Sequence, residues 1–182
     1  GGRTALEQQG YAHYLSANVQ TVHLYGPTRP PTWLGDLPLE VTFAWHNSLR
    51  LFPADADTPP LPSPTMYSAA GAQLPVRYSS KERAVLELLD ELPRHESFHQ
   101  VDALMEGLSD LSPRRLQTLL EACSSVKVKR LFLFFADRHR HAWRSKLDLA
   151  KIDLGSGKRV LVKGGKLDPQ YDITVPADLG GQ

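Results

Sequence analysis

Residues 79–93 read SSKERAVLELLDELP, and this stretch decides the fold. Ser79 followed three residues later by Glu82 matches a capping box, in which two side chains satisfy free amide groups at the start of a helix. Apolar residues then recur at helical spacing, at Ala84, Val85, Leu88, Leu89 and Leu92. Pro93 ends the run because proline cannot continue a helix. The stretch therefore predicts an amphipathic helix with one buried face.

Three further helices are predicted downstream of this stretch. Ser97 with Gln100 repeats the capping box, and Ser112 precedes Pro113, which suits the first position of a helix. Residues 126–141 begin with Val-Lys-Val-Lys, which also alternates as a strand does, but the length of the segment favours a helix. The middle of the chain is thus expected to form a cluster of about four helices.

Strands are predicted on both sides of this cluster. Residues 39–46 alternate between polar and apolar, and the face expected to pack against another layer carries Leu39, Val41, Phe43 and Trp45. Residues 19–25 and 74–78 are two further predicted strands. At the end of the chain, residues 158–163 and 171–175 are expected to pair as a hairpin.

The remaining segments complete the predicted architecture. The proline-rich residues 53–72 predict an irregular surface loop, and residues 4–9 predict a short helix. The fold class is α+β, with a small mixed sheet and a C-terminal hairpin packed with the helical cluster. Residues 1–78 make up the mixed strand and helix part, and residues 79–182 the helical cluster with the hairpin. A chain of 182 residues fits one compact domain made of both parts.

The composition excludes several classes of protein. A single cysteine, Cys123, rules out an intrachain disulfide and a multi-cysteine zinc site, and it suits a reducing compartment. The longest mainly apolar run, residues 131–136, is far shorter than the roughly 20 residues that cross a bilayer. We expect a cytoplasmic protein with no cofactor and no membrane contact. Because the sequence begins with Gly1 and not with Met, we also expect a piece of a longer protein.

Charge is distributed unevenly along the chain. Residues 80–111 hold three Lys/Arg against eight Asp/Glu, whereas residues 112–168 hold fourteen against five, a net of +9. The cations of interest lie on or beside the predicted helix at 126–141, or in the predicted hairpin: Lys127, Lys129, Arg130, Arg138, Arg140, Arg144, Lys158, Arg159 and Lys163. Such a concentration of positive charge indicates a surface that docks onto DNA phosphate or an acidic protein.

The helical part of this charge could form a stripe. At 100° per residue, positions 127, 130, 138 and 141 fall within about 40° of a common direction, that is, in a sector of about 80°. The other interpretation is a solvated helix face opposite the apolar side chains of Leu131, Phe134 and Phe135.

Strings that resemble enzyme motifs lack the surroundings that their chemistry needs. Residues 95–99 read HESFH, the zinc-protease pattern, but Ser97 is a predicted helix start, so the two histidines would not share a helical face. Residues 155–158 read GSGK, but they precede a predicted strand, whereas a phosphate-binding loop precedes a helix. Cys123 falls on an apolar helix face, as structural cysteines do. We therefore expect neither catalytic residues nor a metal site.

Several stretches resemble one known family. They are GGRTAL at residues 1–6, AHYL at 12–15, SKERA at 80–84, and the block that runs from SVKVKR at 125–130 through DLGSGKRVLVKGG at 153–165. Taken together they are similar to the AbiEi family, the antitoxins of type IV, abortive-infection toxin–antitoxin systems of bacterial phage defence. The resemblance implies a transcriptional regulator that represses its own operon and counters a nucleotidyltransferase-like toxin.

For this chain the resemblance implies the C-terminal domain of such a regulator. In the family a winged-helix DNA-binding domain precedes this region, and the DNA-reading positions lie in that domain. The implied activity is a non-catalytic antitoxin function with support of operator DNA binding. The implied partners are operator DNA, bound together with the upstream domain, and the cognate toxin.

Two other functions stay open from the residues alone. The helices predicted from 79 to 123 could form a helix-turn-helix, whose third helix offers Arg114, Arg115 and Gln117 for phosphate and base contacts. A metal-dependent nuclease or hydrolase would need clustered acids, whereas Asp148, Asp153 and Asp168 are spread along the basic region.

Overall fold

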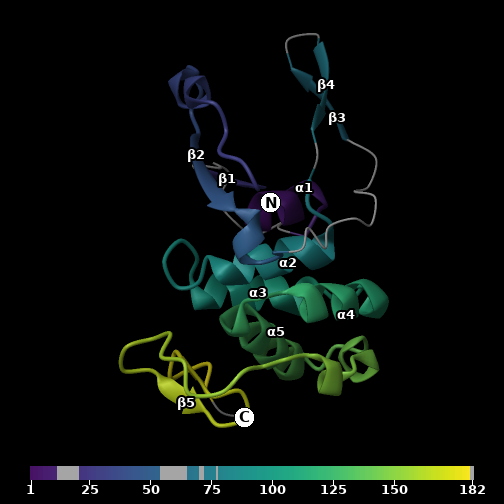
Figure 1. Cartoon of the computed structure of the whole chain (residues 1–182), viewed down its shortest axis with the longest axis vertical. Coiled ribbons are helices and arrows are strands. Elements are labelled where there is room, and N and C mark those ends of the chain that lie inside the picture. Colours follow the sequence, from purple (N-terminus) through teal and green to yellow (C-terminus); the bar gives the residue numbers. More distant parts are fainter. Residues whose placement is uncertain (12–20, 54–64, 70–71, 77, 181–182) are drawn as a thin grey trace.

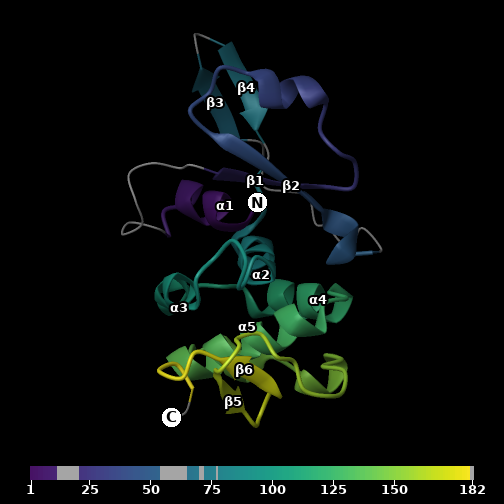
Figure 2. The same ribbon diagram turned by 90° about the vertical axis from the view of Figure 1, so that its left-hand side faces the viewer.

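The molecule has three tiers along its longest axis. The computed structural model describes residues 1–11, 21–53, 65–69, 72–76 and 78–180. Two strand pairs lie at one end, helices fill the middle and a third strand pair lies at the other end (Figures 1 and 2). This arrangement confirms the predicted α+β class.

The four predicted helices of the middle tier are all present. They are α2 (Lys81–Asp90), α3 (Phe98–Gly107), α4 (Pro113–Ala122) and α5 (Val126–His139). Ser97 and Ser112 are N-caps as predicted, because their hydroxyl oxygens accept from the amides of Gln100 at 3.2 Å and Arg115 at 3.5 Å. Residues 126–141 are therefore a helix and not a strand, although α5 ends at His139.

The predicted capping box of α2 is wrong. Ser80 is the N-cap, and its hydroxyl oxygen accepts from the Arg83 amide at 3.3 Å. Glu82 does not reach back to the cap, because its fully buried carboxylate accepts from the Ser112 amide at 3.0 Å. Ser79 instead donates its hydroxyl to Glu87. Contacts with the rest of the fold have replaced the local capping pattern.

The first strand pair lies against the N-terminal helix α1 (Gly2–Gln8) and α2. Strands β1 (Thr21–Gly26) and β2 (Thr42–Asn47) are parallel, with Tyr25 beside His46 in register. The short helices η1 (Thr32–Asp36) and η2 (Ser48–Arg50) lie between and after them. The helix predicted over 4–9 and the strand predicted over 19–25 are confirmed within the described residues.

The apolar face predicted on residues 39–46 is packed only in part. Leu39 lies outside β2 and is 52% exposed, while Phe43 and Trp45 are only half-buried. The face directed at α2 carries Tyr25, whose hydroxyl donates to the Glu87 carbonyl at 3.1 Å, and its neighbour His46. The end of α2 presents polar groups, so the polar aromatic face of the strand pair packs there.

The predicted loop at 53–72 contains regular structure at its end. Strand β3 (Thr65–Ala69) pairs antiparallel with β4 (Ala72–Val76), so the loop prediction is wrong for residues 65–69 and the strand prediction at 74–78 is confirmed with shifted bounds. Residues 54–64 lie outside the described residues.

The C-terminal tier follows the short helices η3 (Arg144–Lys146) and η4 (Leu149–Lys151). Strands β5 (Lys166–Asp168) and β6 (Ile173–Val175) are antiparallel, so β6 confirms the predicted strand over 171–175. The strand predicted over 158–163 is wrong, since only a single bridge joins Arg159 to Ile173. The Thr174 hydroxyl accepts from the amides of Leu161 and Val162, which draws this segment out of a regular ladder.

One apolar core connects the helices with the C-terminal strand pair. It runs from Ala5 and Leu6 of α1 through the four middle helices to Ile173 and Val175 of β6. Residues 131–136 of α5 are all buried, because α5 lies between the other middle helices and the C-terminal strand pair (Figures 1 and 2). In the part of the chain that the structure describes, no helix has the length and apolar character to cross a membrane.

Candidate cationic binding site

The N-terminal half of α5 uses its cations inside the molecule. Lys127 donates its ammonium to the carbonyls of Asp90 at 2.6 Å and Leu92 at 3.0 Å, and it forms an ion pair with the Asp90 carboxylate at 3.2 Å. Lys129 is 4% exposed and Arg130 is 3% exposed. Lys127 thus holds the end of α2, and Lys129 and Arg130 lie in the interior. These three cations therefore do not form an exposed surface.

The C-terminal end of α5 is neutralised by acids. Arg138 forms an ion pair with Asp102 of α3 at 2.9 Å and donates to the Leu179 carbonyl at 3.3 Å. Arg144 forms an ion pair with Asp137 at 2.7 Å. Asp90 and Asp102 of the acidic stretch at 80–111 thus pair with Lys127 and Arg138 of the basic helix.

The predicted stripe at positions 127, 130, 138 and 141 is therefore not an exposed stripe. The four side chains attach to separate places, and His141 contacts the Met105 carbonyl at 2.7 Å. Helical periodicity placed them on similar sides of α5, but α5 is packed on most of its circumference. Their role in binding a partner stays a prediction.

The remaining cations of the basic region are exposed. Among the described residues no acid forms an ion pair with Arg140, Lys158, Arg159, Lys163 or Lys166, and all five side chains are exposed. Arg114 and Lys146 are likewise exposed and without an ion pair among the described residues, but they lie on α4 and η3; we call the five residues from Arg140 to Lys166 named above the free cations. Lys166 was not among the predicted site residues, although it contributes to the net charge of +9 over residues 112–168.

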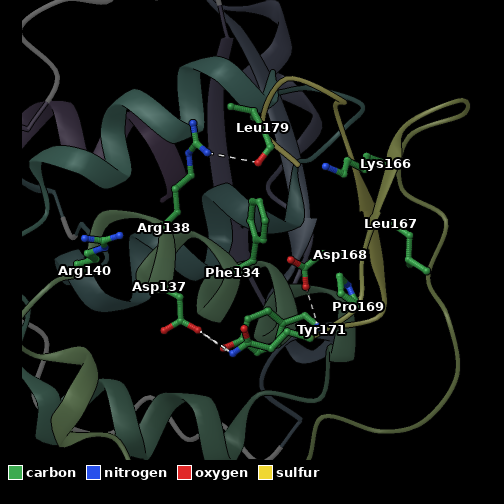
Figure 3. A pocket seen from close by; sticks show the side chains of 11 residues that line it. Phe134, Asp137, Arg138, Arg140, Lys166, Leu167, Asp168, Pro169, Tyr171 and Leu179 are labelled. Atoms are coloured by element: carbon green, nitrogen blue, oxygen red, sulfur yellow. Dashed lines mark hydrogen bonds between the residues drawn. The ribbon is translucent and has the colours of Figure 1, made fainter. Parts of the chain in front are cut away.

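A pocket of about 530 Å³ lies between the end of α5 and the β5–β6 strand pair. Arg138 and Arg140 come from one wall and Lys166 from the other, with Phe134 between them (Figure 3). Arg140 has a left-handed backbone (φ 51°) that ends α5 at this point. The pocket therefore brings two of the free cations, from segments 26 residues apart, to one opening.

The two carboxylates that line this pocket, those of Asp137 and Asp168, already accept hydrogen bonds within the chain. The Tyr171 hydroxyl donates to Asp137, and the Asp168 carboxylate accepts from the Tyr171 amide at 2.8 Å (Figure 3). Burial and the hydrogen bond to Asp137 raise the pKa of Tyr171 to about 12, so the hydroxyl keeps its proton at neutral pH. An anionic group that enters the pocket would be attracted by Arg140 and Lys166. The charges of Asp137 and Asp168 would oppose this attraction less, because they are partly neutralised.

The comparison with protein families decides where the chain belongs. Residues 19–176 match the model of the family described as transcriptional regulator, AbiEi antitoxin, type IV TA system. The chain is a member of this AbiEi family. No curated protein and no solved structure matches it. The matched range includes all five free cations but neither GGRTAL nor AHYL, two stretches on which the resemblance was based.

The alternative DNA-binding residues of the AbiEi chain lie on α4. Arg114 and Arg115 are exposed, and Arg115 lies 3.9 Å from the buried Glu82 carboxylate. The Gln117 side chain accepts from the Asp148 amide at 2.9 Å and donates to the Asp148 carbonyl at 3.1 Å. A base contact by Gln117 would compete with these bonds. Recognition of DNA by α4 stays a prediction.

The enzyme-like strings of the AbiEi chain do not assemble into the sites that they resemble. His95 lies in the connection before α3, and His99 lies in its first turn, 3.5 Å from Asp178. Glu96 is buried in an ion pair with Arg3. Burial raises the pKa of the Cys123 thiol, as in a structural cysteine. Residues 155–158 lead into an extended segment and not into a helix.

The acids proposed for a nuclease are used in local turns. Asp153 accepts from the Gly155 amide at 2.8 Å, and Asp148 accepts from the Ala150 amide at 3.1 Å. Within the described residues, the group with metal-ligand spacing is a different one, made of His23, His46 and Glu91. The sequence analysis missed it because its members become neighbours only through the parallel pairing of β1 and β2 and the packing of α2.

Proposed function

We propose that this AbiEi chain is a non-catalytic antitoxin domain of the cytoplasm that counteracts a nucleotidyltransferase-like toxin and supports the binding of operator DNA. The observation that carries the proposal is the set of five free cations, which lie in the basic region and have no ion pair among the described residues. Exposed cations without an internal ion pair can bind phosphates or carboxylates of a partner without first breaking an ion pair within the chain.

The predicted site residues thus divide into two roles. Arg140, Lys158, Arg159 and Lys163 are proposed to contact the partner directly, together with Lys166. The second group is proposed to position this surface through internal contacts, and it comprises Lys127, Lys129, Arg130, Arg138 and Arg144.

Growth rescue tests the antitoxin role. The chain is co-expressed with the toxin encoded beside it, and wild type is compared with a variant that carries alanine at all five free cations. We expect wild type to restore growth and the variant to fail while both accumulate as folded protein. Arg114→Ala with Arg115→Ala is the matched control, since it removes exposed cations outside this surface. Rescue by the five-alanine variant would contradict the proposal.

Filter binding at two salt concentrations tests the DNA role. The protein used is the full-length regulator that includes the upstream DNA-binding domain implied by the family. The slope of log K against log salt should become less steep by about 0.9 for each phosphate that the five-alanine variant no longer neutralises. If the slope changes only with Arg114→Ala and Arg115→Ala, α4 is the DNA-binding element and the helix-turn-helix alternative is supported.

A further inference from the structure

Three nitrogen and oxygen donors meet where the β1–β2 strand pair packs on the end of α2. The His23 Nδ1 and His46 Nε2 atoms are 2.8 Å apart, and the His23 Nδ1 atom lies 3.7 Å from a Glu91 carboxylate oxygen. One donor atom from each of the three residues lies within 4.8 Å of the others. His23 is 7% exposed and Glu91 is 4% exposed, so this is an interior group.

We propose that His23, His46 and Glu91 bind a divalent transition-metal ion, with Zn²⁺ the expected species. Imidazole nitrogen and carboxylate oxygen are preferred ligands of Zn²⁺, which takes three protein ligands in sites that keep a position open. The proposed ligand atoms are Nδ1 of His23, Nε2 of His46 and Oε2 of Glu91. The β-strand register and the end of α2 already hold all three residues together.

The ligands are supported by a second layer of contacts. The other oxygen of Glu91 accepts from the Tyr25 hydroxyl and lies 3.2 Å from Nδ1 of His46. The hydroxyl of Tyr25 therefore holds the Glu91 carboxylate beside the His46 ring. The His46 ring is stacked between the rings of His23 and Tyr25, with centroids at 5.0 and 4.8 Å. These contacts fix the orientation of the His46 ring before an ion arrives.

A pocket gives access to the cluster and supplies room for a fourth ligand. Its volume is about 690 Å³, and His46, Glu91 and His95 line it. His95 is exposed, and its ring centroid lies 6.0 Å from that of His23 and 6.2 Å from that of His46. His95 therefore shares a site with two distant histidines and not with His99, its partner in the HESFH string. Either His95 or water can fill the remaining position.

The ion would replace the hydrogen bond between the rings of His23 and His46. Of the facing nitrogens of His23 and His46, only one can carry the proton in the 2.8 Å contact between neutral rings. For both facing nitrogens to bind the ion, each neutral ring must carry its single proton on the other nitrogen, Nε2 of His23 and Nδ1 of His46. The ion would join β1, β2 and α2, three elements that are far apart in the sequence.

Metal content and stability of the untagged chain test the proposal. The chain is stripped with a chelator, dialysed, titrated with ZnCl₂ and analysed for bound zinc and thermal stability; CoCl₂ is added in parallel to record visible absorption. We expect one Zn²⁺ per chain, a rise in Tm on adding zinc, and the intense Co²⁺ absorption of a low-coordinate site. His46→Ala should weaken zinc binding by roughly tenfold or more.

Two further variants keep the test decisive. His99→Ala is the matched control, because this exposed histidine belongs to the HESFH string but not to the cluster, and it should bind zinc as wild type does. If His46→Ala does not fold, Tyr25→Phe removes only the hydroxyl that supports Glu91, and its zinc affinity should still fall. Absence of zinc and cobalt binding in wild type, or loss of binding in His99→Ala, would overturn the proposal.

Discussion

Arg130 belongs to the cluster of cations that the sequence predicts as a docking surface, but its contacts in the structure are internal. Arg130 is 3% exposed, and its guanidinium donates to the carbonyls of Leu154 at 2.8 Å and Gly157 at 2.7 Å. The segment after α5 is thereby attached to the helix. We expect Arg130→Ala to lower the free energy of unfolding by about 3 kcal/mol, because the carbonyls of Leu154 and Gly157 lose a charged donor.

Urea denaturation followed by circular dichroism measures this loss. Lys146→Ala is the control, since Lys146 is exposed, and it should change the free energy of unfolding by about 0.5 kcal/mol or less. Equal stability of the two variants would show that Arg130 does not hold the C-terminal segment. Loss of partner binding in Arg130→Ala should follow the loss of folded protein.

Tyr171 gives the chain a pH dependence in the alkaline range. Burial, and then the hydrogen bond to Asp137, raise the pKa of Tyr171 from 10.0 to about 12 in the folded state. The unfolded chain loses this proton first, so the stabilisation is complete below pH 10.0 and is lost as the pH rises toward 12. Tyr171→Phe should therefore lose less stability than wild type between about pH 9 and pH 11.

The measurement is urea denaturation of both proteins across that pH range. Other tyrosines titrate in both proteins, so the difference between the two slopes isolates Tyr171. Parallel slopes would mean that Tyr171 titrates normally and that its contact with Asp137 does not hold the proton.

At the scale of elements, α2 is an acidic helix whose acids point inward. The Glu87 carboxylate is fully buried, accepts from the Gly2 amide at 2.9 Å and forms an ion pair with Arg83 at 2.8 Å. It joins α1 to α2. Glu87→Ala should cost about 3 to 5 kcal/mol in the free energy of unfolding, because the buried Arg83 loses this ion pair and α1 loses an acceptor.

The control is Glu106→Ala, which removes an exposed acid from α3. Thermal unfolding of the two variants should show a large fall in Tm for Glu87→Ala and a small change for Glu106→Ala. Similar Tm values would show that water, not Glu87, satisfies the groups around it.

Elements were predictable where the signal is local. The caps at Ser97 and Ser112 and the length of α5 were sufficient to place helices, because these signals act within a few residues. The buried side of β2 was not predictable, because α2 offers Glu87 and Glu91 to Tyr25 and His46 in place of an apolar surface. The strand expected at 158–163 failed for the same kind of reason, since the Thr174 hydroxyl captures two of its amides.

The candidate sites depend even more on tertiary packing. Residue counts located the basic region, but only the contacts of α5 separate buried Lys129 and Arg130 from exposed Arg140. The acids that neutralise α5 come from helices tens of residues earlier, as Asp102 does for Arg138. No helical-wheel argument contains that information.

At the scale of the whole molecule, we propose that residues 1–78 and 79–182 form one cooperative unit. Three buried acids of the second part depend on the first: Glu87 on the Gly2 amide, Glu91 on Tyr25 and Glu96 on Arg3. The apolar core also crosses the division, since Ala5 and Leu6 belong to the same cluster as α2. Removal of the first part would leave the buried Glu96 without its ion pair, Glu91 without the Tyr25 donor and Glu87 without the Gly2 amide, which is costly.

Tryptophan fluorescence can report on each part separately. Trp33 and Trp45 lie in the first part and Trp143 in the second, where its indole donates to the Leu108 carbonyl at 2.8 Å. A chain with Trp143→Phe then reports on the first part, and a chain with Trp33→Phe and Trp45→Phe reports on the second. Each urea curve is compared with circular dichroism of the same variant, and the two methods should give one midpoint, as a single cooperative unit requires.

The fragment 79–182 is the complementary experiment. Because Glu91 loses the Tyr25 donor, Glu96 loses Arg3 and Glu87 loses the Gly2 amide together with the surface that covers α2, we expect the fragment to lack a cooperative transition at the midpoint of the full chain. A fragment that unfolds like the full chain, or a fluorescence midpoint for Trp33 and Trp45 well below that for Trp143, would show two independent domains. In that case the free cations would belong to a domain that folds without β1, β2 and α1, and growth rescue should be retained by residues 79–182 alone.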